Sequence, residues 1–215
     1  MRRLSRLILT AALALPLASQ ALTLQDLNAG ATFSSSGGEL SFDFAAGSIA
    51  LSGVLPSDLT QYTVLPTAVG FAVSGPLAAI GPAAFGGLTL AYRVSASPGF
   101  ALTGASLQAS GLAFGPGAFA IASSGLSNGA GLGVLLASGG GTGATSNSAF
   151  SAQSILDALG GLQLLALTPG DVAAFGSVQH GFSWIALPEP GTALLLGAGL
   201  LGLGVFGSRR RPLAA

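Results

Sequence analysis

The segment Leu90-Ala91-Tyr92-Arg93-Val94-Ser95 decides the fold class, because the large side chains of Leu90, Tyr92 and Val94 alternate along it with small or polar ones. Successive side chains of a β-strand point to opposite faces, so this alternation predicts a strand with one buried and one solvated face. The same pattern occurs in residues 40–44 and from Val178 to Trp184. Glycine, proline, serine and asparagine interrupt the chain between such stretches. Short strands separated by turn residues predict an all-β fold, a single β-sandwich.

The predicted sandwich occupies the central part of the chain. Residues 22–186 have the length of one domain and can bury a substantial core. One helix is expected within them, at residues 154–159, where Ser154 could act as the N-cap and Asp157 lies in the first turn. The Gly160-Gly161 pair is expected to end this helix after a turn or two.

The first 21 residues have the layout of a cleaved export signal. Arg2, Arg3 and Arg6 precede an almost wholly apolar run at residues 7–17. Small residues follow at the point where signal peptidase requires them. We therefore expect residues 1–21 to be a signal peptide that is cut after Ala21. The domain that follows is expected to be exported across the inner membrane.

Residues 187–215 combine three features in a fixed order. Pro188-Glu189-Pro190 is a stiff, extended stub, because each proline fixes its own φ and removes an amide donor. Residues 192–207 are uncharged and, as a transmembrane helix, would span about 24 Å of the roughly 30 Å of hydrocarbon. Arg209-Arg210-Arg211 then resists translocation and is expected to stay cytoplasmic. The segment is thus expected to be a short, weak membrane anchor with a stop-transfer tail.

This order of motif, apolar run and arginine cluster resembles the PEP-CTERM sorting domain, which marks substrates of exosortase in Gram-negative bacteria. The resemblance implies that exosortase recognises Pro188-Glu189-Pro190, removes the helix and the basic tail, and leaves the domain attached or released at the cell surface. It also implies a link to exopolysaccharide and biofilm. A Gram-positive sortase signal is disfavoured, because Pro190 stands where that signal has the threonine after which sortase cuts.

The central domain also resembles ectodomains that often precede this sorting domain. Those ectodomains look like single β-sandwiches without a known activity, which agrees with the strand pattern. The segments that carry this weaker resemblance are 92–96, 104–107, 148–150 and 178–183.

Composition excludes several kinds of partner. Six of the seven arginines lie in the terminal signals and the chain has no lysine, so residues 22–186 carry only Arg93 against six carboxylates, a net charge of −5. Phosphate binding needs basic side chains, so nucleic acid is not an expected partner. Without cysteine, no disulfide supports the fold and attachment as a lipoprotein is excluded.

Few residues could carry catalysis or hold a metal, and we expect no cofactor. His180 is the only histidine, and with Asp171 and a serine it could form a triad. No Gly-x-Ser-x-Gly turn is present, and the alternation around His180 favours a packed or rim histidine. One histidine without cysteine does not make a zinc site. Four carboxylates could gather around Ca²⁺ but lack the spacing of a calcium loop, and a solvated acidic face is favoured: Asp26, Glu39, Asp43 and Asp58.

Together with what the resemblance implies, these patterns lead us to expect a non-enzymatic cell-surface protein sorted by exosortase, with a structural or adhesive role in contact with extracellular polysaccharide. Two alternatives stay open. An envelope glycan hydrolase would need two carboxylates that face each other across a groove, for which Asp43 or Asp157 could serve. A permanently anchored interaction domain would keep its tail in the membrane. The large aromatic side chains are expected to pack the core or to form a sugar-binding face: Trp184, Tyr62, Tyr92 and the twelve phenylalanines.

Overall fold

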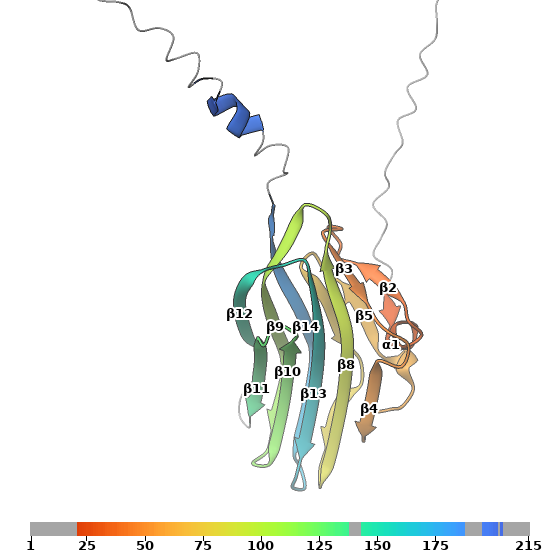
Figure 1. Cartoon of the computed structure of the whole chain (residues 1–215). Coiled ribbons are helices and arrows are strands. Elements are labelled where there is room, and N and C mark those ends of the chain that lie inside the picture. The colour runs from red at the N-terminus through yellow and green to blue at the C-terminus, as the bar shows by residue number, and fades with distance from the viewer. Residues whose placement is uncertain (1–20, 138–142, 188–194, 202, 204–215) are drawn as a thin grey trace, which may run out of the picture.

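The computed structural model describes residues 21–137, 143–187, 195–201 and 203. Two antiparallel sheets of seven strands each make up nearly all of the described domain and pack face to face (Figure 1). This arrangement confirms the predicted all-β class and the β-sandwich.

The first sheet, sheet A, has the strand order β1-β5-β6-β14-β9-β12, and β7 pairs with β14 beside β6. Its two longest strands, β9 and β14, pair along almost their whole length. The bounds are Leu22–Thr23 for β1, Thr63–Pro66 for β5, Gly70–Ser74 for β6, Leu77–Ile80 for β7, Phe100–Phe114 for β9, Ala144–Gln153 for β12 and Val172–Ala186 for β14.

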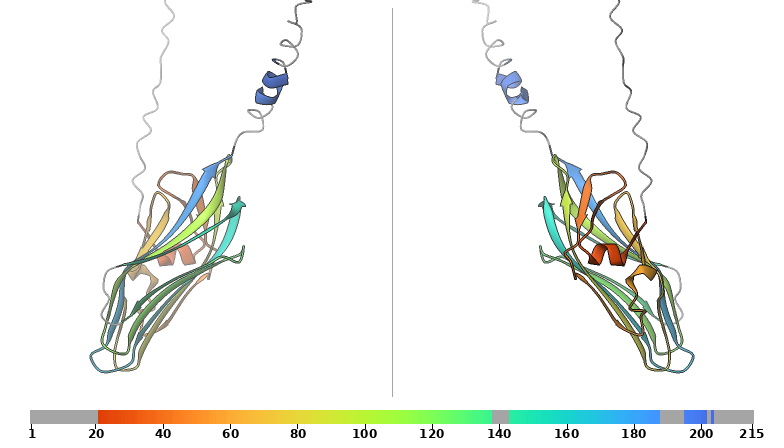
Figure 2. Two further views of the ribbon diagram at one scale, coloured as in Figure 1. Left: turned by 90° about the vertical axis from the view of Figure 1, so that its left-hand side faces the viewer. Right: turned by 90° about the vertical axis from the view of Figure 1, so that its right-hand side faces the viewer.

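The second sheet, sheet B, has the order β11-β10-β13-β8-β3-β2, and β4 pairs with β8 beyond the end of β3. Two short helices, α1 (Leu24–Asn28) and η1 (Leu59–Gln61), lie in the connections (Figure 2). The strand bounds are Thr32–Ser34 for β2, Leu40–Asp43 for β3, Ile49–Gly53 for β4, Ala84–Ala96 for β8, Ala118–Leu126 for β10, Gly131–Ala137 for β11 and Ile155–Ala166 for β13.

The core lies between the two sheets and contains a cluster of aromatic rings. Phe42 and Phe44 from the sheet B side meet Phe71 of sheet A with ring centroids 5.3 and 5.9 Å apart. Tyr92 packs against Phe71 at 5.1 Å and Phe182 lies within the same cluster. Each such side chain contributes about 1.5–3 kcal/mol by leaving water. The expectation that aromatic residues pack the core is therefore confirmed for most of them.

The helix expected at residues 154–159 is wrong. Ser154 forms a bend, and the residues that follow it form β13. This strand is paired on both sides, with β8 and with β10, and its side chains alternate between core and solvent. Pairing on two sides outweighs a short capping signal. The Gly160-Gly161 pair ends nothing, because it lies in the middle of this strand.

The predictions for both ends of the chain concern mostly residues that the structure does not describe. Residues 1–20, Pro188-Glu189-Pro190 and Arg209-Arg210-Arg211 lie outside the described ranges. Ala21 is exposed and directly precedes β1, and residues 195–201 are helical with exposed leucines. In the part of the chain that is described, no helix is long and apolar enough to cross a membrane. The transmembrane helix at 192–207 stays a prediction.

Candidate functional site

A row of three charged side chains crosses the outer face of sheet B. The strands β3, β8 and β13 are neighbours, and their register pairs Asp43 with Arg93 and Arg93 with Asp157. All three side chains point outward, since the residues before and after each one along these strands are buried. Adjacent strands lie about 4.8 Å apart, so the Cα atoms of the two aspartates are roughly 10 Å apart with Arg93 between them.

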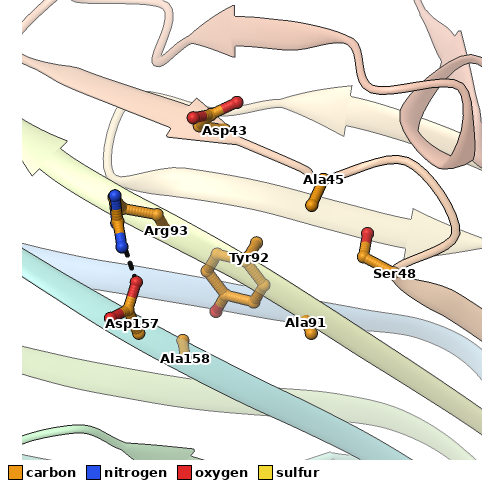
Figure 3. A pocket seen from close by; sticks show the side chains of 8 residues that line it. All are labelled: Asp43, Ala45, Ser48, Ala91, Tyr92, Arg93, Asp157 and Ala158. Carbon is orange, nitrogen blue, oxygen red and sulfur yellow. Dashed lines mark hydrogen bonds and ion pairs between the residues drawn. The ribbon is translucent and has the colours of Figure 1, made fainter.

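The arginine of this row is tied to one of its two carboxylate neighbours. Arg93 donates from Nε to Oδ1 of Asp157 at 2.8 Å (Figure 3). Both side chains remain open to solvent, with 55% and 61% of their surface exposed. The hydrogen bond to Asp157, followed by the charges of Asp157 and Asp43, raises the pKa of Arg93 above its ordinary value. An exposed ion pair of this kind adds little to the stability of a fold.

The three charges line a groove of about 320 Å³. β3 pairs with the C-terminal end of β8 and β4 with its N-terminal half. The connection between β3 and β4, which includes Ala45 and Ser48, forms one wall of the groove (Figure 3). The residues that line it are Asp43, Ala45, Ser48, Ala91, Tyr92, Arg93, Asp157 and Ala158.

This groove continues across the sheet into a second depression of about 450 Å³, with which it shares Ala91, Asp157 and Ala158. The further lining residues are Gly125, Leu126, Ser127 and Leu159. We call the two together the Arg93 groove. It crosses β3, β8, β13 and β10, a width of about 14 Å at the usual strand spacing. Its floor offers ionic and hydroxyl groups beside the exposed apolar side chain of Leu159.

The two carboxylates named from the sequence, Asp43 and Asp157, thus belong to one groove. They do not face each other across it, however, because they project from the same face of one sheet. Arg93 stands between them in the strand register and is hydrogen-bonded to Asp157. The sequence did not identify Arg93 as part of a site, because the register that joins it to a residue 64 positions away is not a local property.

His180 is confirmed as a packed histidine. Only 2% of its surface is exposed, its Nδ1 lies 3.0 Å from the hydroxyl oxygen of Tyr92, and its ring stacks on Phe71 at 5.1 Å. Burial lowers the pKa of His180 to about 4, so the ring is neutral at physiological pH. A Cβ on Gly160 would lie 2.8 Å from its Cε1, and the glycine therefore makes room for the ring.

Asp171 does not join His180 in a triad. It precedes β14, and His180 lies nine positions further along the chain within that strand, so the two residues are about 30 Å apart. Its Oδ2 accepts hydrogen bonds from the backbone N–H groups of Leu167 and Thr168 at 3.1 and 2.7 Å. Burial raises the pKa of Asp171, but the hydrogen bonds from Thr168, Gly117 and Leu167 outweigh it and hold the pKa below its ordinary value. The carboxylate closes the turn between β13 and β14.

Two of the four carboxylates considered for calcium, Asp26 and Asp58, serve separate local purposes. Asp26 shares a capping box with Thr23 at the start of α1, and Asp58 caps η1 through Thr60. Hydrogen bonds from these threonines lower the pKa values of Asp26 and Asp58. Within the described ranges, no three histidine or carboxylate side chains gather where they could hold a metal ion.

Separate from the Arg93 groove, the outer face of sheet A carries an uncharged depression of about 510 Å³. It lies over β12, β9 and β14, where the register shifts near Ala149 and Ser183. None of the eight described residues that line it is charged: Thr103, Gly104, Ala105, Ser106, Asn147, Ser148, Ala149 and Ser183. Its polar groups are hydroxyls and one amide.

Fold and groove together define an all-β sandwich domain with a charged groove on one outer face. Neither protein-family models nor curated proteins match the chain. Among solved structures it is similar to TmCBM61 in complex with β-1,4-galactotriose, at 12% identity and a TM-score of 0.34 over 64% of this chain and 88% of that one.

Two further solved structures are similar to the chain. The enzymatically active domain of tailspike protein 4 of bacteriophage CBA120 shares 16% identity, with a TM-score of 0.30 over 63% of this chain and 18% of that one. The family 11 carbohydrate-binding module of the cellulase Lic26A-Cel5E of Clostridium thermocellum shares 11%, with a TM-score of 0.21 over 66% and 84%. TM-scores of this size give no information on function.

Proposed function

We propose that residues 22–186 form a non-enzymatic domain of the cell surface that binds extracellular polysaccharide through the Arg93 groove and has a structural or adhesive role. The observation that carries the proposal is the exposed row Asp43–Arg93–Asp157. A guanidinium supplies only donors and carboxylates supply only acceptors. Their alternation matches a row of sugar hydroxyl groups, each of which both donates and accepts.

The groove has further properties that suit a polysaccharide. It is open and elongated, and it crosses four strands instead of enclosing a small molecule. Leu159 is 56% exposed beside Asp157, and Ala91 lies in the same groove, so the apolar C–H faces of a sugar have a surface to pack on. The exposed ion pair adds little stability, so fold stability does not explain why Arg93, the only lysine or arginine of residues 22–186, lies here. Ligand binding does explain it.

The proposed role does not include hydrolysis, and it is supported by the register, which puts Arg93 between the two carboxylates of the groove. Glycosidases need an acid and a second carboxylate on either side of the bond that is cleaved. We therefore expect the protein to bind polysaccharide without releasing reducing ends. Appearance of reducing sugar that is lost in an Asp157→Asn variant would support the hydrolase alternative instead.

Binding is tested by comparing the wild-type protein with Arg93→Gln. Exopolysaccharide from the cells that make the protein is mixed with each protein and the bound fraction is measured by sedimentation. We expect at least a tenfold loss for Arg93→Gln, roughly the loss of one or two charge-assisted hydrogen bonds. The matched control is Gln163→Ala, an exposed residue of β13 outside the groove, which should bind like the wild type. Equal binding by all three proteins would refute the site.

We also propose that the chain is delivered by its two ends. Signal peptidase cuts after Ala21, residues 192–207 hold the chain transiently in the membrane, and exosortase recognises Pro188-Glu189-Pro190 and removes the tail. The order of these segments in the sequence supports this route. Intact-mass measurement of surface material should show that Arg209-Arg210-Arg211 is missing. Full-length protein that stays with the membrane pellet would favour the permanently anchored alternative.

A further inference from the structure

We infer that the Arg93 groove selects neutral polysaccharides and rejects anionic ones, and that Asp43 and Asp157 determine this specificity. The inference rests on the proposed function and names its ligand class. It follows from how the charges of the groove are arranged, in three steps.

The first step is the charge of the groove itself. One guanidinium stands between two carboxylates, so the row carries a net charge of −1. Nε of Arg93 is already bonded to Asp157 at 2.8 Å. A carboxylate, sulfate or phosphate on a polymer would have to compete with Asp157 for the guanidinium and would lie next to two like charges. Like charges in such positions oppose binding strongly.

The second step is that no other group of the domain can attract an anionic polymer. Arg93 is the only lysine or arginine in residues 22–186, which carry a net charge of −5. The long-range field of the domain therefore repels a polyanion before contact. The depression on sheet A offers only hydroxyls and an amide, so it does not compensate.

The third step is that the same carboxylates favour a neutral sugar. A hydroxyl donates to a carboxylate without any charge conflict, and a hydrogen bond to a charged group is roughly twice as strong as one between neutral groups. Asp43 has no hydrogen-bond partner among the side chains of the described residues, and Asp157 uses only Oδ1 for Arg93. Acceptor positions on both residues are thus free for sugar hydroxyls.

The experiment separates the exopolysaccharide of the producing cells by anion exchange into a neutral and an acidic fraction. Binding of the mature protein, recovered from the cell surface, to each is measured in a chelating buffer, at ionic strengths of about 0.01 M and 0.15 M. The wild type should bind the neutral fraction with an affinity that changes less than about twofold between the two salt concentrations. The double variant Asp43→Asn/Asp157→Asn turns the net charge of the groove from −1 to +1. It should gain at least about tenfold in binding to the acidic fraction at the lower salt, and this gain should be smaller at the higher salt.

The matched control is Asp26→Asn/Asp58→Asn, which makes the same change of net charge outside the groove. Asp26 is the third helical residue in the capping box of α1 and Asp58 is the N-cap of η1, and in both an asparagine keeps the side-chain oxygen that accepts the local hydrogen bonds. The control should bind like the wild type. An equal gain in the control would show that overall charge, and not the two groove residues, sets the specificity.

The remaining outcomes are distinct. If the wild type prefers the acidic fraction, or binds it once Ca²⁺ replaces the chelator, the inference on ligand class is overturned while the proposed function stands. If the groove double variant gains nothing, Asp43 and Asp157 are not specificity residues. If the wild type binds neither fraction, the proposed function itself fails.

Discussion

Acid should destabilise the sandwich through its single histidine. His180 is buried between the sheets with a pKa of about 4, against 6.5 for an ordinary histidine. Between these two pH values the unfolded chain binds a proton that the folded chain does not. The free energy of unfolding should therefore fall as the pH drops from 6.5 to 4, with no further loss from this group below pH 4. A difference of two to three pH units corresponds to about 3 kcal/mol.

Urea denaturation at a series of pH values measures this loss. The comparison protein is His180→Gln, which lacks the titrating ring and is expected to be less stable near neutral pH because it loses the stacking on Phe71. Carboxylates whose pKa values are lowered, such as Asp26 and Asp58, also contribute to the free energy of unfolding. This contribution is lost only in more acid solution, and equally in both proteins. The difference between the two curves therefore isolates His180. Parallel curves from pH 6.5 to 4 would refute the buried, neutral state of this histidine.

Three other predictions follow from the packing. Gly160→Ala places a methyl group against the ring of His180 and should lower the free energy of unfolding by about 1–3 kcal/mol in urea, whereas Gly161→Ala, on the outer face, should cost much less. Asp171→Ala removes the acceptor for two backbone N–H groups and should lower the melting temperature measured by circular dichroism; an unchanged melting temperature would show that water replaces the carboxylate. Phe42→Ala should cost about 3–5 kcal/mol, and a loss below 1 kcal/mol would contradict its central place in the aromatic cluster.

The sequence predicted the fold class because alternation is a local property of a strand. The alternation of residues 90–95 recurs in β8, and in β14 the side chains of Val178, His180 and Phe182 are buried together, as their shared face predicted. The expected helix at 154–159 failed because a serine cap and an acidic first turn are weak local signals. Two neighbouring strands, which no local pattern reveals, decide the conformation there.

The candidate site could be predicted only in part. Alternation gives the face on which a side chain lies, and it correctly makes Asp43 and Arg93 solvent-facing, whereas Asp157 was expected in a helix. It does not give the register between strands. The three residues become neighbours only because β8 pairs with β3 on one side and with β13 on the other. Asp43 and Asp157 could therefore be named one at a time, whereas the row that they form with Arg93 required the structure.

The Arg93 groove has most of its floor on β8 and β13, strands that are hydrogen-bonded on both sides, and not on loops. Its shape thus exists before any ligand arrives, and association would cost little conformational entropy in the protein. No element of the described residues closes over the groove, so a ligand can leave it without a rearrangement of these strands. If the domain binds polysaccharide as proposed, many copies that each bind a long polymer briefly and rebind further along it would give a matrix that yields under slow strain and resists sudden pulling.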